Sequence, residues 1–198
     1  DFRSPVLDLV NADGSFGCDL RYQGYEICDG KYNLKGLPAV YAAEEEAQTL
    51  IIYMKDQVTG LQVELLYGVL PEYDVITRSA KVINTEEDKI RLTKAQAACI
   101  DFLHGEFDVI SFYGRHAMER NMQRTSVGHG AFVIGSRRGT SSHQYNPMMI
   151  LAEKETTEDA GTCYGMSFVY SGGFKAEVEK DQFGQTRMQM GLQEEQFS

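Results

Sequence analysis

The chain has 198 residues, of which 42% are hydrophobic and 24% are charged, a composition that predicts one globular domain and excludes a long disordered segment. Its formal net charge of −10 would repel a phosphate backbone, so we do not expect nucleic acid as a partner. The apolar runs are far shorter than the ~20 residues that a bilayer span requires, so we expect no membrane partner either.

The first half of the chain carries the clearest strand signals. From Leu61 to Val69 apolar residues recur at every second position, which is the pattern of a half-buried strand. The preceding segment, residues 49–56, is rich in Ile, Leu and Tyr, and Gly60 can take the positive φ of a tight turn. These segments predict a β-hairpin. We expect the other strands of this half at residues 6–10, 19–28 and 75–83.

Residues 92–99 have the composition of a helix, because they contain three Ala together with Leu, Lys and Gln. Apolar residues from Ile90 to Phe102 nevertheless recur with a period of two. Sheet pairing often overrides a helix propensity of a few tenths of a kcal/mol per residue, so we predict a strand here.

Short strands separated by Gly-containing turns continue through the second half. We expect strands at residues 109–113, 132–134, 148–153, 166–170, 174–179 and 186–190. A helix is plausible only around residues 42–47, where three consecutive Glu residues favour a solvated turn. The pattern predicts an all-β fold, a large antiparallel β-sandwich with few or no helices.

One candidate binding site follows the strand expected at residues 109–113. Tyr113, Arg115, His116 and Arg120 combine an aromatic ring with hydrogen-bond donors around Gly114. Sugar sites favour this mixture, because an aromatic face stacks on a pyranose while Arg and His bind its hydroxyls. An equally good interpretation is a strand extension in which Arg115 and Glu119 form an ion pair on one face.

A second polar cluster occupies residues 136–147, between two expected strands. Its two Arg, several hydroxyls, His and amides suit sugar hydroxyls, but a long loop also needs such groups to cap its own backbone. Ser142 and His143 are neighbours in sequence, yet no G-x-S-x-G elbow accompanies them, which argues against a serine hydrolase.

The remaining titratable residues indicate no catalytic or metal site. The four histidines lack the spacing of common metal ligands, and no carboxylate pair stands out as a glycosidase-like acid and base. Asp101, Asp108, Asp159 and Asp181 fall at expected strand edges or turns, where solvation or capping explains them. We expect no catalytic residue, metal or cofactor in this chain.

The cysteines indicate the cellular compartment, and the chain ends indicate whether this is a piece of a longer protein. Cys18, Cys28, Cys99 and Cys163 are widely separated and form no C-x-x-C pair, which favours reduced thiols and a cytoplasmic protein. The chain begins at Asp1 without an initiator Met and stops at Ser198 without a tail, so we expect an excised piece of a longer protein.

Seven segments together resemble one family, in order and over nearly the whole chain. They are similar to the N-terminal domain of α-galactosidases of glycoside hydrolase family 36, in particular to bacterial, lactobacillus-like members. The segments are Asp1–Pro5, Asn11–Ser15, Gly36–Ala39, Tyr73–Ser79, Ser136–Gln144, Tyr170–Gly172 and Asp181–Arg187.

The resemblance implies a β-sandwich that precedes a (β/α)8 catalytic barrel and a small C-terminal β-domain. The parent enzymes hydrolyse terminal α-1,6-linked galactose, as in melibiose and raffinose, with retention, through two aspartates in the barrel. Residues 1–198 would then be a non-catalytic N-terminal domain. Because members begin several dozen residues before the Asp1–Pro5 motif, the chain would also lack the first strands of its own domain.

The resemblance also implies partners and a site. Many members are homotetramers in which this domain reaches the active site of a neighbouring subunit, through the segment matching residues 113–120. Members often have Gly-Ala-Trp there, whereas this chain has His116 preceded by Arg115. We therefore expect Tyr113, Arg115, His116 and Arg120 to contact a galactoside at the pocket rim. The alternative is an autonomous, lectin-like galactoside-binding module that uses the loop at residues 136–146.

Overall fold

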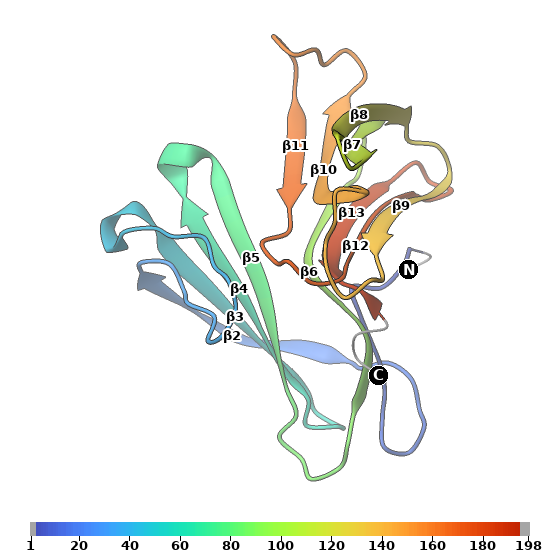
Figure 1. The fold of residues 1–198 in the computed structure, drawn as a ribbon. Helices are drawn as coiled ribbons and strands as arrows, with labels where there is room; N and C mark the ends of the chain where they lie inside the picture. The colour runs from blue at the N-terminus through green and yellow to red at the C-terminus, as the bar shows by residue number, and fades with distance from the viewer. Residues whose placement is uncertain (1–2, 195–198) are drawn as a thin grey trace. The chain divides into compact units, whose positions relative to one another are not determined.

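The computed structural model describes residues 3–194 and confirms the predicted all-β class (Figure 1). Within this range there is no α-helix, only two single turns of 3-10 helix, η1 (Glu44–Glu46) and η2 (Pro71–Tyr73). No helix in the described range is long and apolar enough to cross a membrane. Asp1, Phe2 and residues 195–198 lie outside the described residues, so the predicted extent of one domain over residues 1–198 stays a prediction.

The strands form three antiparallel sheets. The first has the order β1-β6-β13-β12-β9, the second β11-β10-β7-β8 and the third β2-β3-β4-β5. The strands of the first sheet are β1 (Leu7–Val10), β6 (Arg91–Phe102), β13 (Thr186–Leu192), β12 (Phe174–Lys180) and β9 (Gly130–Ser136). Those of the second are β11 (Cys163–Ser167), β10 (Tyr145–Glu153), β7 (Phe107–Arg115) and β8 (Met118–Ser126). Those of the third are β2 (Leu20–Asp29), β3 (Gln48–Asp56), β4 (Gln62–Leu70) and β5 (Val75–Ile83).

The chain divides into two compact units. One contains residues 3–6 and 94–194, and the other contains residues 7–93. In the first unit, strands of the first and second sheets enclose a common core, which is the sandwich that the sequence predicts. Its largest fully buried apolar side chains are Phe174, Met149, Leu151, Met188 and Met190. They lie at alternate positions of β10, β12 and β13, as period-two burial requires.

Strand β6 confirms the prediction made against local helix propensity. It pairs with β13 from Phe102 back to Gln96, and the register shifts where Met190 and Gly191 face Ala98 and Gln96. A Cβ on Gly191 would lie 2.6 Å from the Cα of Gln96, so only Gly permits this close approach.

The second unit contains the predicted hairpin, formed by β3 and β4. The carboxylate of Asp56, which is buried at the end of β3, accepts hydrogen bonds from the backbone N–H groups of Asp19, Val58 and Thr59. Gly60 closes the turn with a φ of 71°. One polar carboxylate therefore fixes both the turn and the start of β2.

Candidate functional site

The four predicted binding residues lie on one hairpin. Tyr113 and Arg115 end β7, His116 lies in a two-residue turn, and Arg120 follows on β8. All four side chains are exposed. The sequence interpretation missed β8 itself, which holds the returning side of the hairpin.

A β-bulge shapes the tip of this hairpin, which we call the β7–β8 tip (residues 113–121). Arg115 pairs with Met118 and Tyr113 pairs with Asn121, so Gly114 faces two residues of β8. Arg120, one of these two, has a φ of 57°. A Cβ on Gly114 would collide with the carbonyl oxygen of Met118 and approach the Cα of Glu119 to 2.8 Å. Gly114 is thus required by the close approach of the two strands.

Local bonds hold the tip in this shape. The guanidinium of Arg115 lies 3.1 Å from the sulfur of Met118, and a Glu119 carboxylate oxygen accepts the N–H of Ala117 at 2.9 Å. The side-chain amide of Asn121 donates to the Met118 carbonyl at 2.8 Å. Among the described residues Arg115 and Glu119 form no ion pair with each other, so the structure does not support the ion-pair interpretation.

The side chains of His116 and Arg120 form no hydrogen bond or ion pair with any other residue in the range 3–194. Their imidazole and guanidinium donors are therefore free to meet a ligand or another part of the protein. A turn that presents uncommitted donors beside an exposed Tyr is chemically suited to sugar hydroxyls.

The polar loop, residues 136–147, adjoins the β7–β8 tip. Tyr145 of β10 pairs with Tyr113, and the N–H of Gly114 donates to the carbonyl of Gln144 at 3.2 Å. The structure thus brings together two clusters that the sequence analysis treated separately. They meet at one end of the second sheet.

Most hydroxyls of the polar loop bind the loop itself. Ser136 donates to the Thr140 carbonyl at 2.6 Å, and the Ser142 hydroxyl accepts the N–H of Gln144 at 3.2 Å. The capping interpretation is therefore confirmed for these groups. Because the Ser142 hydroxyl faces its own backbone, the serine hydrolase interpretation gains no geometric support.

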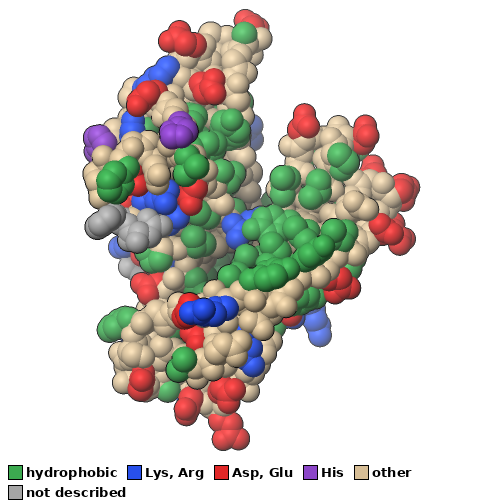
Figure 2. Space-filling model, turned by 180° about the vertical axis from the view of Figure 1, so that it is seen from behind, with side chains coloured by type: hydrophobic (Ala, Val, Ile, Leu, Met, Phe, Trp, Pro, Cys, Tyr) green, Lys and Arg blue, Asp and Glu red, His purple; other side chains and the backbone are tan. Residues whose placement is uncertain are grey.

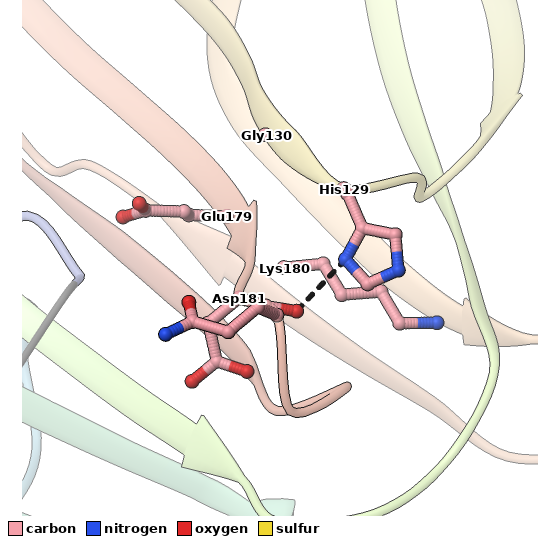
Figure 3. A pocket seen from close by; sticks show the side chains of 6 residues that line it. His129, Gly130, Glu179, Lys180 and Asp181 are labelled. Atoms are coloured by element: carbon pink, nitrogen blue, oxygen red, sulfur yellow. Dashed lines mark hydrogen bonds between the residues drawn. The ribbon is translucent and has the colours of Figure 1, made fainter.

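A separate surface hollow, with a volume of about 390 Å³, lies where β12 turns towards β13 (Figure 3). Its lining residues are His129, Gly130, Glu179, Lys180, Asp181 and Gln182. The imidazole Nδ1 of His129 is 2.8 Å from the carbonyl oxygen of Asp181, whereas Glu179 points away from the ring.

The charged groups of this hollow are engaged in structural bonds. Glu179 accepts the N–H of Ser4 at 2.8 Å, and Lys180 pairs with Glu106 at 2.7 Å. Asp181 accepts the N–H groups at positions 183 and 185, which confirms its predicted role as a turn cap. The three charged side chains of the hollow are therefore held by the fold, and none of these bonds indicates a catalytic pair.

The first and last segments of the family resemblance meet in the sandwich unit. The side chain of Arg3 lies 3.8 Å from the Asp181 carboxylate, and Arg187 donates to the carbonyl of Ser4 at 3.1 Å. Arg187 also holds Asp101 through two hydrogen bonds of 2.7 and 2.9 Å, which lower the pKa of that carboxyl. These motif residues tie residues 3–6 to the sheet, so their role is structural.

Asp108, another carboxylate singled out by sequence, is explained in a similar way. Asp108 is buried and bonds to Arg124 at 2.7 Å, to Ser126 at 3.0 Å and to Lys154. Asp101 and Asp108 are thus held by cations rather than by solvent or a turn. Within residues 3–194 no three His, Cys, Asp or Glu side chains are placed to hold a metal ion together.

Comparison with known proteins gives a match over the whole chain. The model of the family described as "Glycosyl hydrolase family 36 N-terminal domain" matches residues 1–198. The bifunctional alpha-galactosidase/sucrose kinase AgaSK of Mediterraneibacter gnavus is 60% identical over 198 residues, which are all of this chain and 21% of that protein. Alpha-galactosidase Mel36A of Lactobacillus acidophilus is 43% identical over 198 residues, which are 27% of its length.

Solved structures agree with this match. The galactosidase domain of AgaSK has a TM-score of 0.96 at 60% identity and covers 98% of this chain, which corresponds to 27% of that chain. Alpha-galactosidase AgaA of Geobacillus stearothermophilus has a TM-score of 0.95 at 42% identity, with the same coverage of both chains. Variants of AgaA have been solved in complex with stachyose and with raffinose.

The chain spans only about a quarter of the length of these relatives. Within that span the sequence matches cover all of this chain and the structural matches cover 98% of it. The chain belongs to the N-terminal domain family of the glycosyl hydrolase family 36 α-galactosidases.

Proposed function

We propose that this chain is the non-catalytic N-terminal β-domain of a retaining α-galactosidase that removes terminal α-1,6-linked galactose from sugars such as melibiose and raffinose. The observation that carries the proposal is the match over all 198 residues to one domain of relatives of which this chain covers only 21% and 27%. The structural bonds that engage Asp101, Asp108 and Asp181 also favour a supporting domain, because these carboxylates are not free to act as acid or base.

The proposed direct contribution to catalysis is the β7–β8 tip. Tyr113, Arg115, His116 and Arg120 would form part of the rim of a galactoside pocket whose other walls come from a barrel. The bulge at Gly114 supports this role, because it fixes the direction of a turn that carries exposed donors. The adjoining polar loop carries further exposed donors, Arg138 and His143, and His143 directly precedes Gln144, whose carbonyl bonds to the tip.

The proposed partners are the catalytic barrel of the same protein and neighbouring subunits of a homotetramer. A domain that supports a barrel and an oligomer needs surfaces beyond its own core, and this chain exposes several large apolar side chains. The proposed location is the cytoplasm, and four cysteines that form no disulfide agree with a reducing compartment.

The rim role is tested with His116→Ala in the full-length protein that contains this chain. Removing one hydrogen bond of ~1 kcal/mol to the sugar should lower kcat/KM for melibiose and raffinose about fivefold. His104→Ala is the matched control, because His104 is also exposed but lies in the turn before β7. Unchanged kcat and KM in the His116 variant would show that the tip does not contact substrate.

One observation favours a second function, an autonomous galactoside-binding module. The tip and the polar loop place two clusters of sugar-binding residue types at one end of a sheet. Titration calorimetry of the isolated chain, residues 1–198, with melibiose and raffinose separates the two proposals. A supporting domain should give no heat of binding, whereas saturable binding by the isolated chain would establish the module.

A further inference from the structure

Two exposed tyrosines, which we call the tyrosine pair (Tyr113 and Tyr145), lie where the β7–β8 tip meets the polar loop. Tyr113 of β7 and Tyr145 of β10 are partners in the antiparallel ladder, and they are 43% and 37% exposed. Partners in such a ladder point to the same side of the sheet, with Cβ atoms about 5 Å apart. The two side chains therefore start next to each other on one face.

The tyrosine pair lies at the end of a buried row of the second sheet. Two and four residues before Tyr113, the same face of β7 carries Ser111 and Val109, which are 2% and 1% exposed. Met149, the partner of Ser111, is fully buried. This face thus runs from the closed core at Ser111 to solvent at Tyr113, so the tyrosine pair borders the core on one side and meets solvent on the other.

The fold does not use the polar groups of the tyrosine pair. Within residues 3–194 neither hydroxyl forms a hydrogen bond, and neither ring contacts another aromatic ring. The backbone beside both residues is nevertheless fixed, because the N–H of Gly114 donates to the carbonyl of Gln144 at 3.2 Å. Two side chains that are held in place by their strands therefore leave their hydroxyls to a ligand.

The surroundings of the tyrosine pair suit a sugar. His143 and Gln144 directly precede Tyr145, and both are exposed. The exposed His116 follows Tyr113 in the turn of the hairpin. A sugar ring stacks its apolar face on an aromatic ring and bonds its hydroxyls to donors of this kind.

Other exposed tyrosines have different neighbours. Figure 2 shows hydrophobic side chains gathered over the sheet β2-β3-β4-β5, where Tyr25 lies beside the aliphatic Ile27 and Ile52. Aliphatic side chains offer neither an aromatic stacking face nor a hydrogen-bond donor. The tyrosine pair, with donors on both sides, is therefore the better candidate for a sugar.

We propose that the tyrosine pair is a second sugar subsite, a stacking platform for the sugar unit that follows the terminal galactose. The ligand class is a galactoside whose galactose is linked to a further sugar ring. This inference rests on the proposed function, because it extends the rim formed by the β7–β8 tip. It adds Tyr145 of the polar loop to the residues that contact substrate.

A ratio of two substrates tests the subsite in the full-length protein. It compares kcat/KM for melibiose, whose galactose is followed by a glucose ring, with kcat/KM for methyl α-galactoside, which has no second ring. Tyr145→Ala should lower this ratio about fivefold, the loss expected for one aromatic contact. Loss of folded protein alone lowers both values alike and leaves the ratio unchanged. A ratio equal to that of the parent would show that Tyr145 only closes the end of the core, and it would overturn the proposal.

Two further variants sharpen the test. Tyr145→Phe keeps the ring and loses only the hydroxyl, so it should keep the ratio of the parent. A ratio as low as that of Tyr145→Ala would overturn the stacking role. Tyr41→Ala removes a tyrosine that is 88% exposed and belongs to the other unit, so it should leave the ratio unchanged. An equal fall in this control would also overturn the proposal.

The two substrates separate the subsite from the proposed function. If the parent hydrolyses both substrates and Tyr145→Ala leaves their ratio unchanged, only the second subsite is rejected. If the parent hydrolyses neither substrate, the proposed galactosidase is rejected, and the subsite is rejected with it.

Discussion

Gly114 shows how strongly one residue determines the β7–β8 tip. Gly114→Ala should destabilise the chain by about 1–3 kcal/mol, because the new methyl group collides with the backbone of Met118 and Glu119. Urea denaturation of the isolated chain measures this loss. Gly128→Ala is the control, since a Cβ there meets nothing within 4 Å. Equal stability of the two variants would contradict the close approach at Gly114.

Asp101 gives a prediction for pH. Hydrogen bonds from Arg187 lower the pKa of Asp101 in the folded chain, so its contribution to stability is present above the unfolded pKa of ~3.9 and is lost as pH falls through the folded value. Asp101→Asn should therefore cost about 1 kcal/mol at pH 7, a modest value because the pair is partly exposed.

The cost of Asp101→Asn should shrink towards zero as the pH falls below the folded pKa of Asp101. Denaturation curves from pH 7 down to pH 3 measure the difference between variant and parent. Asp159→Asn, at an exposed turn residue, should show little difference at any pH. A cost for Asp101→Asn that is independent of pH would show that the ion pair is not its source.

At the scale of elements, alternation and turn residues were enough to predict most strands. The hairpin of β3 and β4 and the strand β6 follow from period-two apolar residues, and the structure confirms them. Strand β8 could not be predicted, because its side chains are mostly exposed and polar at a sheet edge. Because β8 was not predicted, Asn121 was not recognised as the residue whose side-chain amide bonds to the Met118 carbonyl at the tip. The Gly within residues 113–120 was the available signal for a bulge.

The β3–β4 hairpin depends on one carboxylate. Asp56→Ala should destabilise the chain by about 2–3 kcal/mol, because it leaves the N–H groups of Asp19, Val58 and Thr59 without their acceptor in a buried site. Thermal and urea denaturation measure the effect. Asp88→Ala, an exposed turn residue before β6, is the control and should change stability little. A similar loss in both variants would contradict this role.

At the scale of the whole molecule, the residues alone predicted a β-sandwich but not its third sheet. Alternation tells which faces are apolar, whereas the assignment of strands to sheets depends on contacts distant in sequence. Residue chemistry also left the tip and the polar loop as separate candidates, because only the pairing of β7 with β10 joins them. The family resemblance supplied the expected placement beside a catalytic barrel, which no local pattern contains.

The last prediction concerns the isolated chain as a catalyst. Residues 1–198 should release no galactose from melibiose or raffinose, because the Ser142 hydroxyl bonds to its own loop and the carboxylates Asp101 and Asp108 are held by cations. Galactose release by the isolated chain, compared with the full-length protein at equal concentration, measures this. Turnover by the isolated chain that disappears in Ser142→Ala or His143→Ala would place a nucleophile in the polar loop. Turnover that survives both changes would place catalysis elsewhere in the chain, and either result would reject a purely supporting role.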